Sequence, residues 1–176
     1  MMMDPCNFDP QRLDQAALAV KERLQMAGSS LVLAESCTGG LIAATLARIP
    51  GVSAHLAGSF VVYQIASKTA WIGVCAATIE QWGVVSEQVA LEMAAGALQR
   101  TPHAVVSLSI TGDLGPGAAE QTDGTAWLAV DSRLTGSAAK LIRLAPQTAA
   151  DFPSLRWIRQ QQAAALALEY LLEWLN

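Results

Sequence analysis

The spacing of hydrophobic residues changes repeatedly along the chain between helical stripes and short continuous apolar runs. Residues 12–26 carry apolar side chains three or four positions apart, which predicts an amphipathic helix that ends at Gly28. Residues 31–34 form a continuous apolar run, which is typical of a strand covered on both faces. A loop over residues 35–40 and an Ala-rich segment over residues 41–48 follow. This region is therefore predicted to be a strand, a tight loop and a helix.

The rest of the chain continues this alternation of strands and helices. Residues 60–63 are β-branched and aromatic and predict a second strand, which leads into a short segment that contains Lys68. Ser86 is a suitable N-cap for a helix over residues 87–100. The remaining predicted elements are strands at 105–110, 125–130 and 140–144, a turn at 135–136, and a helix from Pro153 to Leu175. The pattern predicts a three-layer α/β/α sandwich around a mixed, mostly parallel sheet of about five strands.

Length and composition agree with a compact domain. A chain of 176 residues suffices for one domain with a core, so residues 1–176 are expected to form a single domain with a flexible tail over about residues 1–10. Hydrophobic residues make up 52% of the chain and charged residues 15%, which excludes disorder for most of it. No apolar run reaches the length of a membrane span, and the N-terminus lacks a secretory pattern. A cytoplasmic protein without a membrane partner is expected.

Charge and metal-binding residue types remove further classes of function. The net charge of −4 arises from 11 basic and 15 acidic residues spread thinly along the chain, so no nucleic-acid partner is expected. Cys6, Cys37 and Cys75 lack any paired spacing, and His55 and His103 belong to no ligand motif. Neither a metal ion nor another cofactor is therefore expected.

Two loops that follow predicted strands carry the candidate chemistry, because open α/β sheets place their crevice at the carboxyl ends of strands. The first loop, Glu35–Gly40, has two glycines that permit a sharp turn and amide groups at a helix start, where anions bind favourably. It offers Ser36, Cys37 and Thr38 as nucleophiles, although a capped turn would have the same residues. The second loop, residues 111–123, is either the other wall of a site or a plain connection.

Several motifs, read in order, resemble the CinA C-terminal domain family. The first is Ala34–Ala44, with the sequence AESCTGGLIAA. The further matches are Pro50–Ala54, Phe60–Tyr63, Lys68, Ile72–Val74, Gly83–Glu87, Thr111–Gly112, Gly115–Pro116, Gly124–Trp127, Arg156 and Arg159. The resemblance covers nearly the whole chain, from about Leu13 to Leu172, and the additional N-terminal domain of larger members is not expected within these 176 residues. It implies an amidohydrolase that converts nicotinamide mononucleotide to nicotinic acid mononucleotide and ammonia.

The resemblance also implies roles for individual residues. Ser36 corresponds to the nucleophile, Lys68 to the general base and Tyr63 to a nearby catalytic tyrosine. A lysine acts as a base only if its pKa is lowered, and Lys68 is the only charged residue between Arg48 and Glu80, which favours its burial. The alternative is an exposed lysine on a short helix.

Substrate contacts are expected from both loops. The amides of residues 37–39 would serve either a tetrahedral oxyanion or a substrate phosphate, and the second loop would contact ribose or phosphate. The residues expected to bind this small nucleotide substrate are Glu35, Cys37, Thr38, Gly39, Gly40, Thr111, Gly112 and Gly115.

Departures from the family pattern support a second hypothesis, a catalytically weak or inactive paralogue that binds small molecules or partners. The segment Tyr63–Lys68 reads Tyr-Gln-Ile-Ala-Ser-Lys, where active members usually read Tyr-Ser-Asn-Glu-Ala-Lys. Ser59 replaces a glycine, Asp113-Leu114 replaces Ile-Ala, and residues 117–123 form a shorter segment. A carboxylate at Asp113 would repel a phosphate if it pointed into the site.

Two further hypotheses concern the nucleophile and the substrate. One gives the role of nucleophile to Cys37, with His55 or His103 as its base, although neither histidine lies near it in the sequence and buried cysteines are mostly inert. The other is a hydrolase of a different amide.

Aromatic content predicts self-association. The chain has five tryptophans, namely Trp71, Trp82, Trp127, Trp157 and Trp174. Aromatic residues are enriched in interface cores, and a long terminal helix with two tryptophans offers more apolar length than one sheet face covers. A symmetric homo-oligomer is therefore expected, the alternative being that this helix packs along its own domain.

Overall fold

The computed structural model describes residues 9, 11–144 and 154–175. Its elements are α1 (Arg12–Ala27), β1 (Leu31–Glu35), α2 (Leu41–Ala47), η1 (Val52–Ala54), β2 (Leu56–Val61), α3 (Ile65–Ile72), α4 (Ala76–Trp82), α5 (Glu87–Arg100), β3 (Val106–Asp113), β4 (Thr125–Ser132), β5 (Gly136–Arg143) and α6 (Ser154–Trp174). Nearly all of the expected N-terminal tail, and Pro153, lie outside the described residues. Within the described ranges, no helix combines the length and hydropathy needed to cross a membrane.

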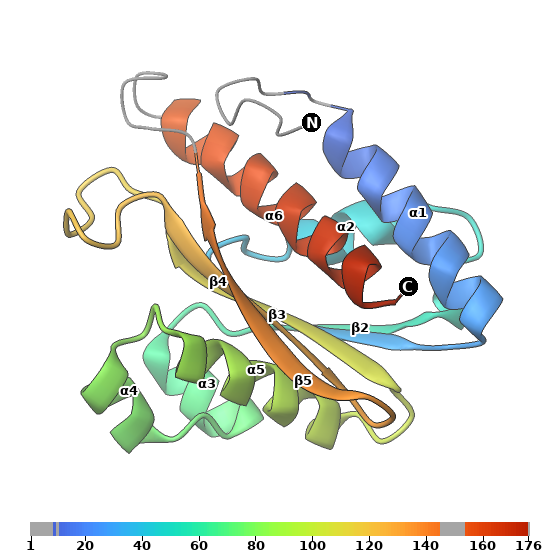
Figure 1. The fold of residues 1–176 in the computed structure, drawn as a ribbon, viewed down its shortest axis with the longest axis horizontal. Helices are drawn as coiled ribbons and strands as arrows, with labels where there is room; N and C mark the ends of the chain where they lie inside the picture. The colour runs from blue at the N-terminus through green and yellow to red at the C-terminus, as the bar shows by residue number, and fades with distance from the viewer. Residues whose placement is uncertain (1–8, 10, 145–153, 176) are drawn as a thin grey trace.

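The five strands form one mixed sheet in the order β2-β1-β3-β4-β5. The β2–β1 and β1–β3 pairs are parallel, whereas β3–β4 and β4–β5 are antiparallel, so β4 runs against the other four strands. Helices α1, α2 and α6 cover one face of this sheet, and α3, α4 and α5 cover the other (Figure 1). The predicted three-layer α/β/α sandwich with five strands is confirmed.

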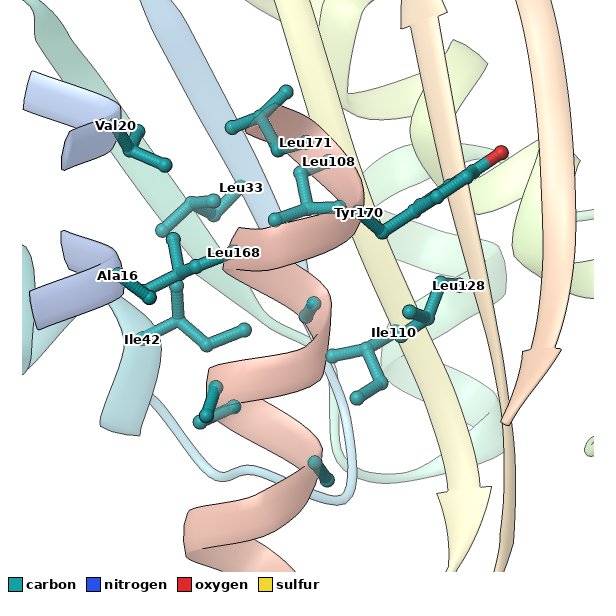
Figure 2. Packing of buried hydrophobic residues seen from close by; sticks show 14 of the residues in the cluster. Ala16, Val20, Leu33, Ile42, Leu108, Ile110, Leu128, Leu168, Tyr170 and Leu171 are labelled. Carbon is teal, nitrogen blue, oxygen red and sulfur yellow. The ribbon is translucent and has the colours of Figure 1, made fainter. Parts of the chain in front are cut away.

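Alternation of side chains along β1 divides the core between the two faces of the sheet. Leu33 joins the larger apolar cluster, in which Leu168 and Leu171 of α6 pack against the sheet (Figure 2). Val32 and Ala34 join the second cluster, beneath α5. The same alternation, continued past the last apolar residue, directs consecutive side chains at the end of β1 to opposite faces of the sheet. This placement decides the roles of the residues in the first loop.

Strands β2 and β5 begin four residues before their predicted ranges, while β3 and β4 extend past theirs to Asp113 and Ser132, so that residues 111–113 of the predicted second loop belong to β3. Strand β2 runs from Leu56 to Val61, where residues 60–63 were predicted, because its register is set by parallel pairing of its start with the start of β1. Val62 has already left the sheet and is fully buried where the chain turns towards α3. Strand β5 begins at Gly136 and ends at Arg143, earlier than the predicted 140–144, because the full length of β4 pairs with it.

Helix ends follow the predicted signals. Gly28 adopts a left-handed conformation (φ 58°) after α1, and its amide donates to the Gln25 carbonyl. At the start of α5, the Ser86 hydroxyl accepts a hydrogen bond from the Val89 amide at 3.3 Å. Both contacts satisfy backbone groups that a helix end leaves without an intrahelical partner.

Candidate active site

Ser36 lies at the carboxyl end of β1, where the chain turns into α2. Its amide donates to the Ile110 carbonyl of β3 at 3.1 Å, and its carbonyl accepts from the Gly39 amide at 3.0 Å. Gly39 and Gly40 have φ values of 63° and 95°, a left-handed conformation that favours glycine and makes the turn possible. The backbone of Ser36 is thus held on both sides, and its side chain continues the face of β1 that is covered by α3 and α5.

Lys68 projects from α3 into the interior and contacts Ser36. Its side chain is 0% exposed, and its Nζ donates to Ser36 Oγ at 2.7 Å and to the Val62 carbonyl at 2.6 Å. The predicted burial and the predicted proximity to Ser36 are both confirmed. Burial lowers the pKa of Lys68 from its ordinary 10.5 to about 8, while the Cys37 thiol acts in the opposite direction. Near neutral pH, a fraction of Lys68 is therefore unprotonated and able to accept the Ser36 proton.

Glu35 organises the loop from the other face of the sheet. Its fully buried carboxylate accepts hydrogen bonds from Thr38 Oγ1 (2.8 Å), Gly40 N (3.1 Å), Ile42 N (3.1 Å), Ala43 N (2.9 Å) and Ser59 Oγ (3.3 Å). A carboxylate with this many donors anchors the start of α2. The structure thus gives Glu35 and the Thr38 hydroxyl a role within the chain, and the Ser59 departure supplies one of the donors.

A cavity of about 230 Å³ opens beside Ser36. Its lining comprises Ser36, Cys37, Tyr63, Ile65, Val84, Val85, Thr111, Gly112, Asp113, Leu114 and Arg156. Ser36, Tyr63, Cys37, Thr111 and Gly112 are thus brought to one space. The other residues expected to bind substrate, namely Glu35, Thr38, Gly39, Gly40 and Gly115, are not part of this lining.

Some backbone amides of the first loop donate hydrogen bonds within the chain, and others do not. Gly39 N donates to the Ser36 carbonyl, and Gly40 N donates to Glu35. Among the described residues, neither Cys37 N nor Thr38 N donates to another residue, and the Cys37 amide contacts only the thiol of its own side chain. Because Cys37 also lines the cavity, its amide is the better placed donor for an oxyanion that forms at Ser36.

Arg156, near the start of α6, bridges two segments at the cavity. Its Nη2 donates to Tyr63 Oη at 2.6 Å, and its Nη1 donates to the Gly115 carbonyl at 2.8 Å. The predicted site residues did not include Arg156, although the motif match at the start of the last helix had pointed to it. A guanidinium in this position could bind a phosphate through two parallel hydrogen bonds.

Arg159 fixes the second loop against α6. It is almost fully buried, and its two terminal nitrogens each donate to one carboxylate oxygen of Asp123 at 2.8 Å. This contact holds the pKa of Asp123 below its ordinary range. A Cβ at Gly124 would lie 2.9 Å from Arg159 Nη2, so glycine permits this close approach. One turn of α6 also reaches the first loop, since Gln160 Nε2 donates to the Thr38 carbonyl at 2.9 Å.

The geometry disfavours Cys37 as a nucleophile. Its thiol is buried, and burial raises its pKa to about 12, which removes the reactive thiolate. His55 precedes β2, whose start pairs with the start of β1, so it lies at the end of the strand opposite Cys37. His103 lines a separate cavity together with His55. No group of three or more potential metal ligands occurs in the described part of the chain.

Relatives of this chain fall into two length classes. A protein from Enterobacter agglomerans named nicotinamide-nucleotide amidohydrolase PncC is 43% identical over 119 residues, which cover 66% of this chain and 72% of the relative. A protein from Mycolicibacterium vanbaalenii named CinA-like protein is 46% identical over 113 residues, which cover 64% of this chain and 26% of the relative. The chain thus spans about a quarter of the length of CinA-like relatives.

Solved structures agree with these sequence relationships. A competence/damage-inducible protein from Agrobacterium tumefaciens has a TM-score of 0.83 and 33% identity, with 95% of this chain and 98% of that chain covered. A CinA superfamily protein from Escherichia coli has a TM-score of 0.83 and 27% identity, with 98% of each chain covered. The CinA C-terminal domain model matches residues 13–175, which include both loops and all six α-helices in whole or in large part. Fold, motifs and relatives agree, and the chain belongs to the CinA C-terminal domain family.

Proposed function

We propose that this chain is an amidohydrolase that deamidates nicotinamide mononucleotide to nicotinic acid mononucleotide and ammonia, with Ser36 as nucleophile and Lys68 as general base. The observation that carries the proposal is the 2.7 Å contact between Lys68 Nζ and Ser36 Oγ beside a cavity. A serine hydroxyl attacks an amide only when a base removes its proton, and a buried lysine with a lowered pKa supplies that base. The activity named for the Enterobacter agglomerans relative supports the same reaction.

The first half of the reaction transfers the acyl group to Ser36. Neutral Lys68 takes the hydroxyl proton while Ser36 Oγ forms a bond to the carboxamide carbon, and the C=O electrons move onto oxygen. The Cys37 amide donates to this oxyanion. The C–N bond then breaks, the protonated Lys68 returns its proton to the departing nitrogen, and ammonia leaves. The Val62 carbonyl, 2.6 Å from Nζ, keeps the amine directed at Ser36 throughout.

The second half hydrolyses the ester. Water enters the position that ammonia has left, Lys68 accepts one of its protons, and the water oxygen bonds to the acyl carbon. A second tetrahedral oxyanion forms at the same amide donor. The bond to Ser36 Oγ breaks, the serine recovers a proton from Lys68, and the free carboxylic acid leaves. In each half, Lys68 first accepts a proton from the attacking group and then donates a proton to the leaving group, as in other amidases that use a nucleophile.

Tyr63 and Arg156 act at the mouth of the cavity in this proposal. Tyr63 accepts the Arg156 hydrogen bond at 2.6 Å and so orients the guanidinium towards the space where the phosphate of the nucleotide would lie. A cavity of about 230 Å³ is smaller than typical ligand pockets of about 300–1,000 Å³. It therefore holds the carboxamide ring, and the ribose phosphate extends towards Arg156.

A second candidate function is binding without turnover. Ile65 lines the cavity and is 52% exposed, at a position where active members carry a polar amide. An apolar side chain at this point removes a hydrogen-bonding group from the rim beside the proposed base. A chain of this kind would hold the nucleotide without reacting with it.

Incubation of the purified protein with nicotinamide mononucleotide separates the two candidates. We expect equal amounts of ammonia and nicotinic acid mononucleotide to accumulate with time, measured by a coupled ammonia assay and by chromatography. The Ser36→Ala protein, purified in the same way, controls for contaminating amidases. Saturable binding of the nucleotide with neither product would refute the amidase and establish the binding protein.

A further inference from the structure

Two opposite charges line the cavity without neutralising each other. Asp113 closes β3, Arg156 belongs to the first turn of α6, and both contribute to the same 230 Å³ space. Neither forms an ion pair with any described residue, each other included. The Arg156 donors go to a neutral hydroxyl and a neutral carbonyl instead. Within the described ranges, each charge therefore lacks an opposite charge of the kind that a ligand could supply.

The alternation of side chains along β3 places Asp113 on the same face of the sheet as Ser36. Side chains two positions apart on a strand point to the same face. Ser109 Oγ donates to the Ala90 carbonyl of α5, and Thr111 Oγ1 donates to the Val84 carbonyl, so this series faces the α3–α5 layer. Asp113 is the next member of the series, and the cavity between Ser36 and Val84 lies on that face.

The negative charge of Asp113 is not needed to hold the second loop, residues 111–123, in its conformation. Its two hydrogen bonds, from Gly115 N at 3.3 Å and from Thr122 Oγ1 at 3.4 Å, are both long, and a neutral amide oxygen could accept one of them equally well. The bidentate Arg159–Asp123 contact closes the loop. The charge of Asp113 thus has no structural partner to explain it.

We propose that the two charges make the site selective for zwitterionic pyridinium nucleotides, with Asp113 facing the cationic ring and Arg156 binding the phosphate. The inference rests on the proposed function, since it places the substrate carboxamide at Ser36. A pyridine ring joined to ribose through its nitrogen carries a full positive charge, and in so small a cavity that charge lies near every lining group. The reverse arrangement would set a carboxylate against a phosphate, which repel each other.

Calorimetric titration in a Ser36→Ala background tests this selectivity without turnover. The ligands are nicotinamide mononucleotide, its reduced form with a neutral dihydropyridine ring, and nicotinamide riboside, which has the cationic ring but no phosphate. We expect Asp113→Asn to raise the Kd of both cationic-ring ligands about 10-fold and to leave the Kd of the reduced nucleotide unchanged or lower. We expect Arg156→Gln to weaken both phosphorylated ligands about 10-fold and the riboside hardly at all.

Matched variants control for charge and for fold. Asp131→Asn removes the same charge from β4 opposite Ser107, at the far end of the β3–β4 pair, and should leave all three Kd values unchanged. Asp113→Glu keeps the charge and should keep the preference for the oxidised ring. Thermal melting of each variant shows whether it is folded.

The outcomes for selectivity and for catalysis are distinct. An equal effect of Asp113→Asn on oxidised and reduced nucleotide, or no effect on either, overturns the inference, because ring charge is then not what Asp113 recognises. Wild-type protein that shows the ring-charge preference but no deamidation refutes the proposed function and leaves the inference standing. Failure of the Ser36→Ala protein to bind nicotinamide mononucleotide overturns both.

Discussion

Burial of Lys68 lowers the free energy of unfolding and, by the same effect, increases the fraction of Lys68 that is neutral and able to accept a proton. Its pKa falls from 10.5 to about 8 on folding because water is removed from the ammonium group. Between pH 8 and 10.5 the unfolded chain holds a proton that the folded chain has released, so the free energy of unfolding rises with pH in this window. Below pH 8 both states hold the proton, and the full cost of burying the charged ammonium group applies. Folding thus lowers the pKa of Lys68 far enough for its amine to serve as the proposed general base.

This protonation equilibrium predicts the pH dependence of activity. Because only neutral Lys68 can accept the Ser36 proton, kcat/KM should rise about 10-fold per pH unit up to about pH 8 and level off above it. Initial rates of ammonia release from nicotinamide mononucleotide between pH 6 and 9.5 measure this profile. Lys68→Arg, which keeps the positive charge but does not titrate, should be inactive throughout the range. A rate independent of pH from 6 to 8 would contradict the role of Lys68.

The sequence could predict the contact between Ser36 and Lys68 but not the roles of the neighbouring residues. Ser36 and Lys68 stood out because one belongs to a motif and the other is a lone charge in an apolar segment. A carboxylate next to a nucleophile suggests substrate binding, yet Glu35 points to the opposite face and accepts five hydrogen bonds from the chain. Arg156 reaches the cavity across 93 residues of sequence from Tyr63, and sequence spacing carries no information on such a contact.

At the scale of elements, α3 delivers Lys68 to the site and depends on a close approach to α5. Gly96 of α5 lies against the end of α3, and a Cβ built there would come within 1.8 Å of the Ile72 carbonyl oxygen. Backbone at that distance cannot yield by a change of side-chain rotamer. The position of α3, and with it the contact between Lys68 and Ser36, therefore requires glycine at position 96.

The Gly96→Ala change should displace α3. We expect a net loss of about 1–3 kcal/mol in the free energy of unfolding from overpacking, despite the better helix propensity of alanine. We also expect kcat to fall more than KM rises, because the base moves relative to the nucleophile. Urea unfolding and steady-state kinetics measure the two effects. Ala95→Ser, on the exposed side of the same helix, is the control, and unchanged kcat in a folded Gly96→Ala protein would contradict the coupling.

Elements with a strong apolar pattern were predictable and the others were not. β1 is buried at every position and α5 carries a clear N-cap, so both appear in the sequence within one residue of their observed ranges. β2 is an edge strand with half-buried positions, and Gly58 and Ser59 interrupt its pattern. Helix α4 has no fully buried side chain, so no apolar stripe marks it. Pairing with β1 and packing on α5 decide these two elements, and both are long-range effects.

At the scale of the whole molecule, aromatic side chains remain at the surface. Trp71 of α3, Trp82 of α4 and Trp157 of α6 are 52–55% exposed, whereas Trp174 packs against the larger apolar cluster. The end of α6 is therefore covered within the chain, whereas Trp157 in its first turn is half-exposed although Leu155 and Arg159 beside it are buried. Half-exposed tryptophans on both helical layers match the composition of interface cores.

These exposed aromatics support the expected symmetric homo-oligomer. We predict that multi-angle light scattering at micromolar concentration gives a mass that is a multiple of 18.5 kDa. Trp157→Arg and Trp82→Arg, tested separately, should show which layer forms the contact, because an arginine without a partner at an interface core weakens association. A mass of one chain for the wild-type protein would decide against the oligomer.

The central claim is that Ser36, activated by Lys68, attacks the carboxamide of nicotinamide mononucleotide. The most direct test compares the deamidation rates of Ser36→Ala and Cys37→Ala, two neighbouring truncations of one small polar atom each. Ser36→Ala should lose at least about a thousand-fold in kcat, since groups that act as a unit fail when either is removed. Cys37→Ala should keep a rate within about ten-fold of the wild type, because its thiol is buried and protonated. An inactive Cys37→Ala protein beside an active Ser36→Ala protein would contradict the account.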